Sequence, residues 1–205
     1  PDTVSLLIRA RAVVNRQDNF GYTPLFLAAA AGKKACVNIL MNDGGAQFSI
    51  TSNLGQNPLH AAAAAGRSEL VEYFLNQFAR HLRQVERERS ATNESVTEPA
   101  DEKPATENAT ENHEPTTTPT ASSPDQNQNN KTAVASSSNP NIIDRADRGG
   151  KTALYLAASY GQLDVVLLLI DYEADPRVTT CTGSTALHAA CSNGFQEIAE
   201  ILLEC

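Results

Sequence analysis

The densest group of potentially reactive side chains lies at residues 181–194, which read CTGSTALHAACSNG. Cys181, His188 and Cys191 offer two thiols and an imidazole within eleven positions. Such groups can form a nucleophile with its base or part of a metal site, because thiolate and imidazole serve in both. Their spacing does not choose between these uses and a structural one. The elements that carry them must decide.

The same pattern occurs four times along the chain. The segments GYTPLFLAAAAG, GQNPLHAAAAAG, GKTALYLAASYG and GSTALHAACSNG begin at Gly21, Gly55, Gly150 and Gly183. The first two glycines are 34 positions apart, the last two 33 and the middle pair 95, which is about 62 more than one period. A fixed period near 33 residues predicts a solenoid of stacked units.

Each copy has the signals of two helices joined by a turn. A side-chain oxygen that can cap a first helix stands at Thr23, Asn57, Thr152 and Thr185. The glycines that can end this helix in a left-handed conformation are Gly32, Gly66, Gly161 and Gly194. A second segment then carries a bulkier apolar stripe, as in Val165, Val166 and Leu169. The pattern predicts a helix-turn-helix in every unit.

The segments TPLFLAAAAG, NPLHAAAAAG, TALYLAASYG and TALHAACSNG resemble the ankyrin repeat, whose units carry Thr-Pro-Leu-His-x-Ala near the start. The resemblance covers roughly residues 1–80 and 143–205, and VSLLIRARAVVN resembles the second half of a further unit. It implies an all-α solenoid of stacked helix-turn-helix units with short β-turn or hairpin tips. Arg11 and Glu173 stand where the family usually has glycine, so we expect strained or altered turns there.

The domain plan follows from the repeats and from one segment that differs in composition. We expect a partial repeat at 1–18, repeats at 19–50 and 51–89, an insertion at 90–142, a repeat at 143–177 and a truncated one at 178–205. The insertion holds eight acidic and two basic residues and almost no large apolar side chains. It cannot bury enough surface to offset its chain entropy, so we predict that it is disordered.

The repeat register answers the question of chemistry. His188 occupies the position of Phe26, His60 and Tyr155, and a base or metal ligand would not be exchanged for phenylalanine. Cys191 takes the place of alanines, which predicts a small packed residue, and Cys181 falls at an exposed turn tip. We therefore expect no catalytic residue, metal, cofactor or small-molecule substrate, with redox activity of Cys181 the one open alternative.

The resemblance implies that partner proteins bind to the turn tips and to the ends of the first helices. The candidate residues are Asn19, Phe20, Tyr22, Asn53, Leu54, Gln56, Arg148, Lys151, Tyr160, Cys181 and Ser184. Phe20, Tyr22 and Leu54 either form an apolar binding site or pack against one another. Arg148 and Lys151 form either a basic binding site, for an acidic partner or for the acidic insertion of the same chain, or a solvated charged turn.

The second helix of the unit at 51–89 continues past its normal length. Apolar residues at Phe74, Phe78, Leu82 and Val85 predict a helix from about 68 to 89. Phe78 and Leu82 either pack on a neighbouring unit, which we favour, or await a partner. We also predict that the units on either side of the insertion stack continuously, with Thr118 and Ser123 of the insertion as possible phosphorylation sites before proline.

The composition further limits the kinds of partner and the cellular location that we expect for this protein. The net charge of −8 disfavours nucleic acid as a partner, and the apolar stretches are too short for membrane insertion. Four cysteines without a paired spacing favour a reducing, intracellular location, cytoplasmic or nuclear. The sequence thus predicts an interaction scaffold or adaptor. The alternatives are the ankyrin arm of a larger enzyme, such as a ubiquitin ligase or kinase, and a cytoskeletal or membrane-protein anchor, since we expect a longer parent chain.

Overall fold

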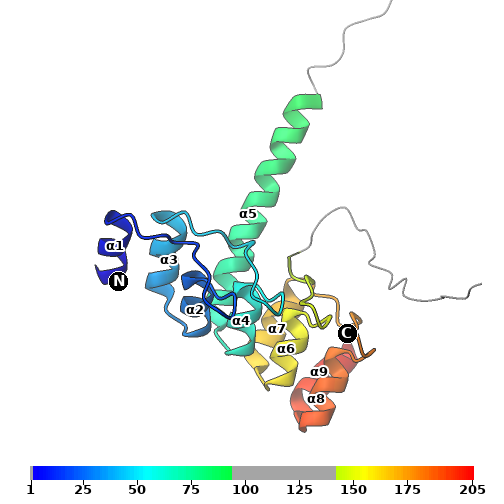
Figure 1. The fold of residues 1–205 in the computed structure, drawn as a ribbon. Helices are drawn as coiled ribbons and strands as arrows, with labels where there is room; N and C mark the ends of the chain where they lie inside the picture. The colour runs from blue at the N-terminus through cyan, green and yellow to red at the C-terminus, as the bar shows by residue number, and fades with distance from the viewer. Residues whose placement is uncertain (1, 94–141) are drawn as a thin grey trace, which may run out of the picture.

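The computed structural model describes residues 2–93 and 142–205, with the backbone alone at 81–82 and 85–93 (Figure 1). Within these residues the elements are helices and turns, and the tips contain no strand. The helices are α1 (Asp2–Arg9), α2 (Pro24–Ala30), α3 (Lys34–Asn42), α4 (Pro58–Ala64), α5 (Ser68–Asn93), α6 (Ala153–Ser159), α7 (Leu163–Asp171), α8 (Ala186–Asn193) and α9 (Gln196–Glu204). The predicted all-α solenoid is confirmed.

The first helices form one row and the second helices pack beside them. Helix α2 contacts α4, α4 contacts α6, and α6 contacts α8, while each also packs against the second helix of its own unit. One buried leucine sits at the same place in three successive first helices: Leu25, Leu59 and Leu154 are each no more than 1% exposed. Short alanine-rich helices allow this close approach, so the core runs continuously through the stack.

The predicted caps hold the first helices in place. The side chains of Thr23, Asn57 and Thr152 accept backbone N–H bonds at 3.2, 3.1 and 3.2 Å from the third residue of their helices. At the fourth copy the Thr185 amide donates to Nδ1 of His188 at 3.3 Å, as the Asn57 amide does to Nδ1 of His60 in the second copy. The glycines after these helices are left-handed, with φ between 67° and 77°. Arg11 and Glu173 are also left-handed, at φ 58° and 63°.

The stack crosses the insertion without a break. Helices α4 and α5 pack on α6 and α7, which follow residues 94–141 in the chain. The Arg148 amide donates to the carbonyl oxygen of Leu54 at 2.9 Å, and the Tyr172 hydroxyl donates to Oδ1 of Asn76 at 3.1 Å. These bonds join residues that are 94 and 96 positions apart in the sequence.

Helix α5 is longer than the sequence pattern indicates. It ends at Asn93, four residues past the predicted end near 89, so the first part of the predicted insertion is helical. At about 1.5 Å per residue its 26 residues span about 39 Å, and it projects away from the stack (Figure 1). Phe78 packs as predicted, with its ring centroid 4.7 Å from that of Phe48. The side chain of Leu82 lies outside the described residues.

Candidate protein-binding surface

Each tip is a turn closed by one short polar side chain. Oδ1 of Asp18 accepts the amides of Phe20 and Tyr22 at 2.9 and 2.8 Å. Oδ1 of Asp147 accepts the amides of Gly149 and Lys151 at 2.8 and 2.9 Å in the same way. Ser52 and Thr180 hold the other two tips through their hydroxyl oxygens. These bonds give the four tips the same shape, because the backbone donors are satisfied locally.

The tips are also bonded to one another in series. The Asn53 amide donates to the carbonyl oxygen of Phe20, and the Cys181 amide to that of Gly149, both at 2.9 Å. The bond from Arg148 to Leu54 occupies the equivalent place between the two middle tips. We call the resulting edge, which comprises residues 18–22, 52–56, 147–151 and 180–184, the tip surface. Its backbone is fixed from unit to unit.

Apolar side chains stand out on the first two tips. Phe20 is 67% exposed and Leu54 is 58% exposed, on tips that are hydrogen-bonded to each other. Tyr22 is half-buried because it stacks on Phe26, with ring centroids 4.5 Å apart, and on Phe20, at 5.8 Å. One face of the Phe20 ring therefore packs against Tyr22. Phe20 and Leu54 keep most of their side-chain area open to solvent.

The other predicted binding residues divide by exposure. Six are exposed along the tips or at the end of α6: Asn19, Asn53, Arg148, Lys151, Tyr160 and Cys181. Two are half-buried and already bonded: Nε2 of Gln56 donates to Oδ2 of Asp147 at 3.1 Å, and the Ser184 amide donates to Thr180. Gln56 therefore joins two tips across the insertion.

The third tip carries positive charge. Arg145, Arg148 and Lys151 are exposed, and Nζ of Lys151 lies 5.8 Å from the ring centroid of Tyr155. Asp147 lies among them but is half-buried, and its carboxylate oxygens accept the tip amides and Gln56. The outward-facing charge of this tip is therefore cationic.

His60 links the middle units from inside the stack. It is 1% exposed, and its Nε2 lies 3.2 Å from the carbonyl oxygen of Lys151 in the next unit. Its Nδ1 lies 2.6 Å from Oδ1 of Asn57 and 3.3 Å from the Asn57 amide nitrogen, so both ring nitrogens have a polar partner. Burial lowers the pKa of His60 below its ordinary value of 6.5, and the Asp147 carboxylate opposes this only in part.

The reactive side chains in residues 181–194 have separate surroundings. His188 is exposed and bonds to Thr185, and Cys181 is exposed at the tip as predicted. The prediction that Cys191 is packed is wrong, because it is exposed. Its counterparts Ala29 and Ala158 are fully buried, in helices that pack on the first helix of the next unit, α2 on α4 and α6 on α8. Among the described residues no three His, Cys, Asp or Glu side chains are grouped to hold a metal.

Sequence reasoning missed the residues that shape the tip surface. Asp18, Ser52, Asp147 and Thr180 each stand three positions before a tip glycine, a recurrence that is visible in the sequence. A short oxygen-bearing side chain at this spacing is the signal of a self-closed turn. The possible phosphorylation sites Thr118 and Ser123 lie outside the described residues.

A row of helical pairs with a hydrogen-bonded edge defines the class of repeat proteins that expose one long continuous surface. A family model described as "Ankyrin repeats (3 copies)" matches residues 1–84 and 121–205. The chain therefore belongs to the ankyrin-repeat family, as its sequence motifs indicate.

Curated relatives match part of the chain. An inactive serine/threonine-protein kinase TEX14 from Bos taurus is 42% identical over 62 residues, which is 30% of this chain and 4% of the relative. The neurogenic locus notch homolog protein 1 is 42% identical over 62 residues in Mus musculus and 40% over 63 in Danio rerio, covering 2% and 3% of those proteins. The chain thus spans a very small part of these relatives. Within its described residues, no helix combines the length and apolarity needed to cross a membrane.

Proposed function

We propose that this chain is a protein–protein interaction scaffold, an adaptor that binds partner proteins along the tip surface and the adjoining ends of the first helices. The observation that carries the proposal is the exposed pair Phe20 and Leu54 on two bonded tips. A few well-packed residues carry most of the binding energy of an interface, and aromatic side chains are enriched at its core. A fixed backbone under them lowers the entropy lost on binding.

The charge pattern supports a partner with both apolar and acidic groups. Phe20 and Leu54 supply the apolar contacts, and Arg148 and Lys151 of the next tip supply cationic ones. Charged groups at the rim of an interface mainly raise the association rate and fix the register. A partner segment lying across three tips would meet these features in that order.

Three further features belong to the same proposal. Ankyrin-repeat modules are typically non-catalytic, and we infer no enzymatic activity for this chain. Its cysteines are unpaired in the described residues, which supports an intracellular location, cytoplasmic or nuclear. Phosphorylation at Thr118 or Ser123 would add negative charge and so regulate the scaffold. A phosphate-affinity gel after treatment with a proline-directed kinase tests this last point, and an unshifted band would contradict it.

The proposal is tested by affinity capture with matched variants. The double variant Phe20→Ala and Leu54→Ala removes the two exposed anchors, and Leu167→Ala removes a 42% exposed leucine from α7 as the control. Partners captured by the wild type and the control should be lost with the double variant, while the circular dichroism spectra agree. Equal capture by all three proteins would refute a role for the tip surface.

A second candidate function is that of a recognition arm within a larger enzyme, or of a cytoskeletal or membrane-protein anchor. It is supported by the small share, 2–4%, that the matched region takes up in the much longer relatives. The tip surface would then bring a substrate or an anchored protein to another domain. Domain analysis of the whole protein distinguishes the two candidates, because a scaffold requires no catalytic or membrane-spanning segment.

A further inference from the structure

Four matched positions along the tip surface carry four different kinds of residue. The residue directly before the tip glycine is Phe20 in the first tip, Leu54 in the second, Gly149 in the third and Thr182 in the fourth. Phe20 and Leu54 are 67% and 58% exposed. Leu54 stays exposed although a tip is bonded to its own tip on either side, so the exposure belongs to this position of the tip. A partner lying along the tips would meet two apolar side chains, then a gap, then a hydroxyl.

The gap at Gly149 lies between two cationic side chains. Arg148 and Lys151 are exposed before and after it in the tip. Gly149 is not left-handed, so the backbone does not require glycine there. A Cβ at Gly149 would lie 3.9 Å from both Cγ and Cε of Lys151, so the stem of the lysine runs beside the gap. The missing side chain thus leaves room for a partner's side chain next to two cations.

The carboxylates near this gap are already engaged by backbone amides. Oδ1 of Asp147 accepts the amides of Gly149 and Lys151 at 2.8 and 2.9 Å. Oδ1 of Asp144 accepts the amide of Asp175 at 2.9 Å. Both acids are half-buried, whereas the three basic residues within 145–151 are exposed. An acidic side chain of a partner is therefore favoured at the third tip, because complementary charge fixes the register of an interface.

The stacking sets the distance between the matched positions. The carbonyl oxygens of Phe20, Leu54 and Gly149 each accept an amide of the next tip at 2.9 Å, so the tips follow the helices beneath them. Successive first helices pack directly, α2 on α4 and α4 on α6, and the axes of packed helices lie about 8–10 Å apart. A bound segment must therefore present its side chains toward the tips at this interval.

A polyproline II helix has this repeat. It has three residues per turn and rises about 3.1 Å per residue, so every third residue faces the same side at intervals of about 9 Å. A β-strand does not fit, because its residues i and i+3 face opposite sides and its residues i and i+2 are only about 7 Å apart. An α-helix rises about 5.4 Å per turn, so its side chains on one face recur at intervals that are too short.

We propose, as an inference that rests on the proposed function, that the tip surface binds a partner segment in the polyproline II conformation. The segment carries apolar side chains at its first and fourth positions and an acidic one at its seventh, in either chain direction. The apolar side chains contact Phe20 and Leu54, and the carboxylate lies over Gly149 between Arg148 and Lys151. Polyproline II segments bind to aromatic surfaces with a small loss of entropy, because their conformation is already formed.

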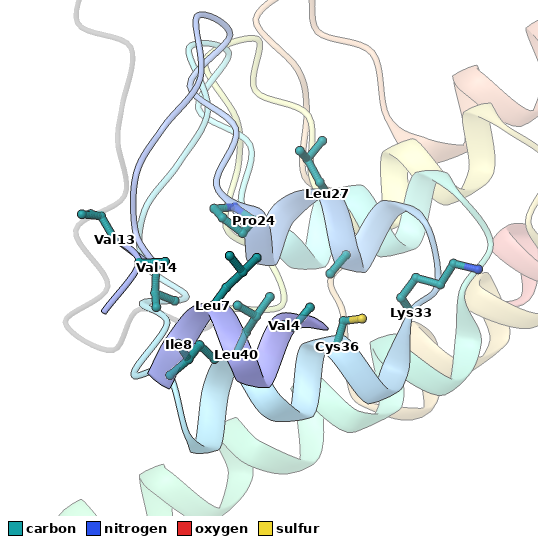
Figure 2. Close-up of a pocket in the computed structure, with 12 residues that line it drawn as sticks. Val4, Leu7, Ile8, Val13, Val14, Pro24, Leu27, Lys33, Cys36 and Leu40 are labelled. Carbon is teal, nitrogen blue, oxygen red and sulfur yellow. The ribbon is translucent and has the colours of Figure 1, made fainter. Parts of the chain in front are cut away.

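The test uses two fluorescent peptides, Gly-Leu-Pro-Pro-Leu-Pro-Pro-Glu-Gly and its reverse sequence, added to the whole chain and followed by anisotropy. At least one should bind saturably, and Leu54→Ala should weaken it at least about tenfold, because an apolar contact is lost. Leu27→Ala is the matched control and should bind like the wild type. Leu27 is 50% exposed, but it lines a separate apolar pocket of about 350 Å³ between α1 and α2 (Figure 2).

The spacing is tested with altered peptides. Peptides in which one proline or three prolines separate the anchors, in place of two, should bind at least about tenfold more weakly, because they cannot reach all three tips at once.

The charge is tested by exchanging it between the chain and the peptide. The variant Arg148→Glu with Lys151→Glu should lose the glutamate peptide and bind one that carries lysine in place of glutamate. Such a gain of binding cannot result from misfolding. The matched control is Arg80→Glu with Arg83→Glu, which reverses two exposed charges on α5 and should leave the preference for glutamate unchanged.

Four results would overturn the proposal. They are no binding of either peptide, binding that does not depend on the spacing, binding that Leu27→Ala weakens and Leu54→Ala does not, and a wild-type dimer that Leu54→Ala dissociates. In the last case a second copy of the chain would cover the tips. Affinity capture distinguishes these results from failure of the proposed function, because loss of captured partners with Phe20→Ala and Leu54→Ala would leave the scaffold intact and refute only the polyproline II mode.

Discussion

Replacing Gly55 with alanine should destabilise the protein much more than replacing Gly183 does. Both glycines hold the same position in their tips, with φ of 81° and 77°, so both variants carry the cost of a left-handed alanine, about 1 kcal/mol. A Cβ on Gly55 would lie 2.9 Å from the Arg148 amide nitrogen, whereas a Cβ on Gly183 meets no atom within 4 Å. The difference between them therefore isolates the contact between tips.

The magnitude follows from that contact. Overpacking against a fixed backbone costs about 1–3 kcal/mol. Loss of the bond from the Arg148 amide to the Leu54 carbonyl adds about 0.5–1.5 kcal/mol. We therefore expect the free energy of unfolding to fall by about 1 kcal/mol for Gly183→Ala and by about 2.5–5.5 kcal/mol for Gly55→Ala.

Urea denaturation followed by far-ultraviolet circular dichroism measures both values, because the free energy of unfolding falls linearly with denaturant. Gly150→Ala is a second test, since its Cβ would lie 2.7 Å from the Cys181 amide nitrogen. It should resemble Gly55→Ala. Equal losses for Gly55→Ala and Gly183→Ala would refute the contact between the two tips that flank residues 94–141.

Other perturbations test the interior. Because burial lowers the pKa of His60, the unfolded chain takes up a proton below pH 6.5 that the folded chain does not. As the pH decreases from 6.5 toward the lowered pKa of folded His60, the free energy of unfolding should fall by up to about 1.4 kcal/mol per pH unit. His60→Phe should remove this contribution in urea titrations at several pH values. Phe48→Ala should cost about 3 kcal/mol in the same assay, because its ring packs edge-on against Phe74 and Phe78 at 5.0 and 4.7 Å. Glu173→Gly should leave stability unchanged or raise it by up to about 1 kcal/mol, since it relieves a left-handed glutamate; a loss above 1 kcal/mol would contradict this.

The repeated register made the helices predictable from the sequence. Capping oxygens before each first helix and glycines after it are local signals, and they fix the conformation of the residues that carry them. Thr23, Asn57 and Thr152 cap as expected for this reason. The end of α5 was less predictable, because residues 80–93 contain neither glycine nor proline to stop a helix.

The burial of single residues was harder to predict because it depends on neighbouring units. Cys191 and Ala158 have the same register position and the same helical surroundings, yet Cys191 is exposed. Phe48 lies in the segment that contains the extra residue of the 34-residue spacing between the first two copies, so it has no equivalent position in the other copies and the repeat pattern predicted no role for it. Its burial against α5 comes from a contact over 26 positions, which no local pattern contains.

The candidate site was predictable in outline but not in its bonding. Phe20, Leu54 and Arg148 are exposed on the tips, as the repeat pattern predicts. The bond from Gln56 to Asp147 joins side chains 91 positions apart, and only the stacked arrangement brings them together. The tip surface thus depends on stacking as much as on the sequence of each tip.

One measurement tests most directly whether the units on either side of residues 94–141 form a single stack. A specific protease site introduced near residue 115 allows the chain to be cut after folding, and size-exclusion chromatography then reports whether the two pieces stay together. We predict that they co-elute as one particle with the helical content of the uncut chain, held by the packing of α4 on α6 and α5 on α7. Pieces that separate under native conditions would contradict a continuous stack.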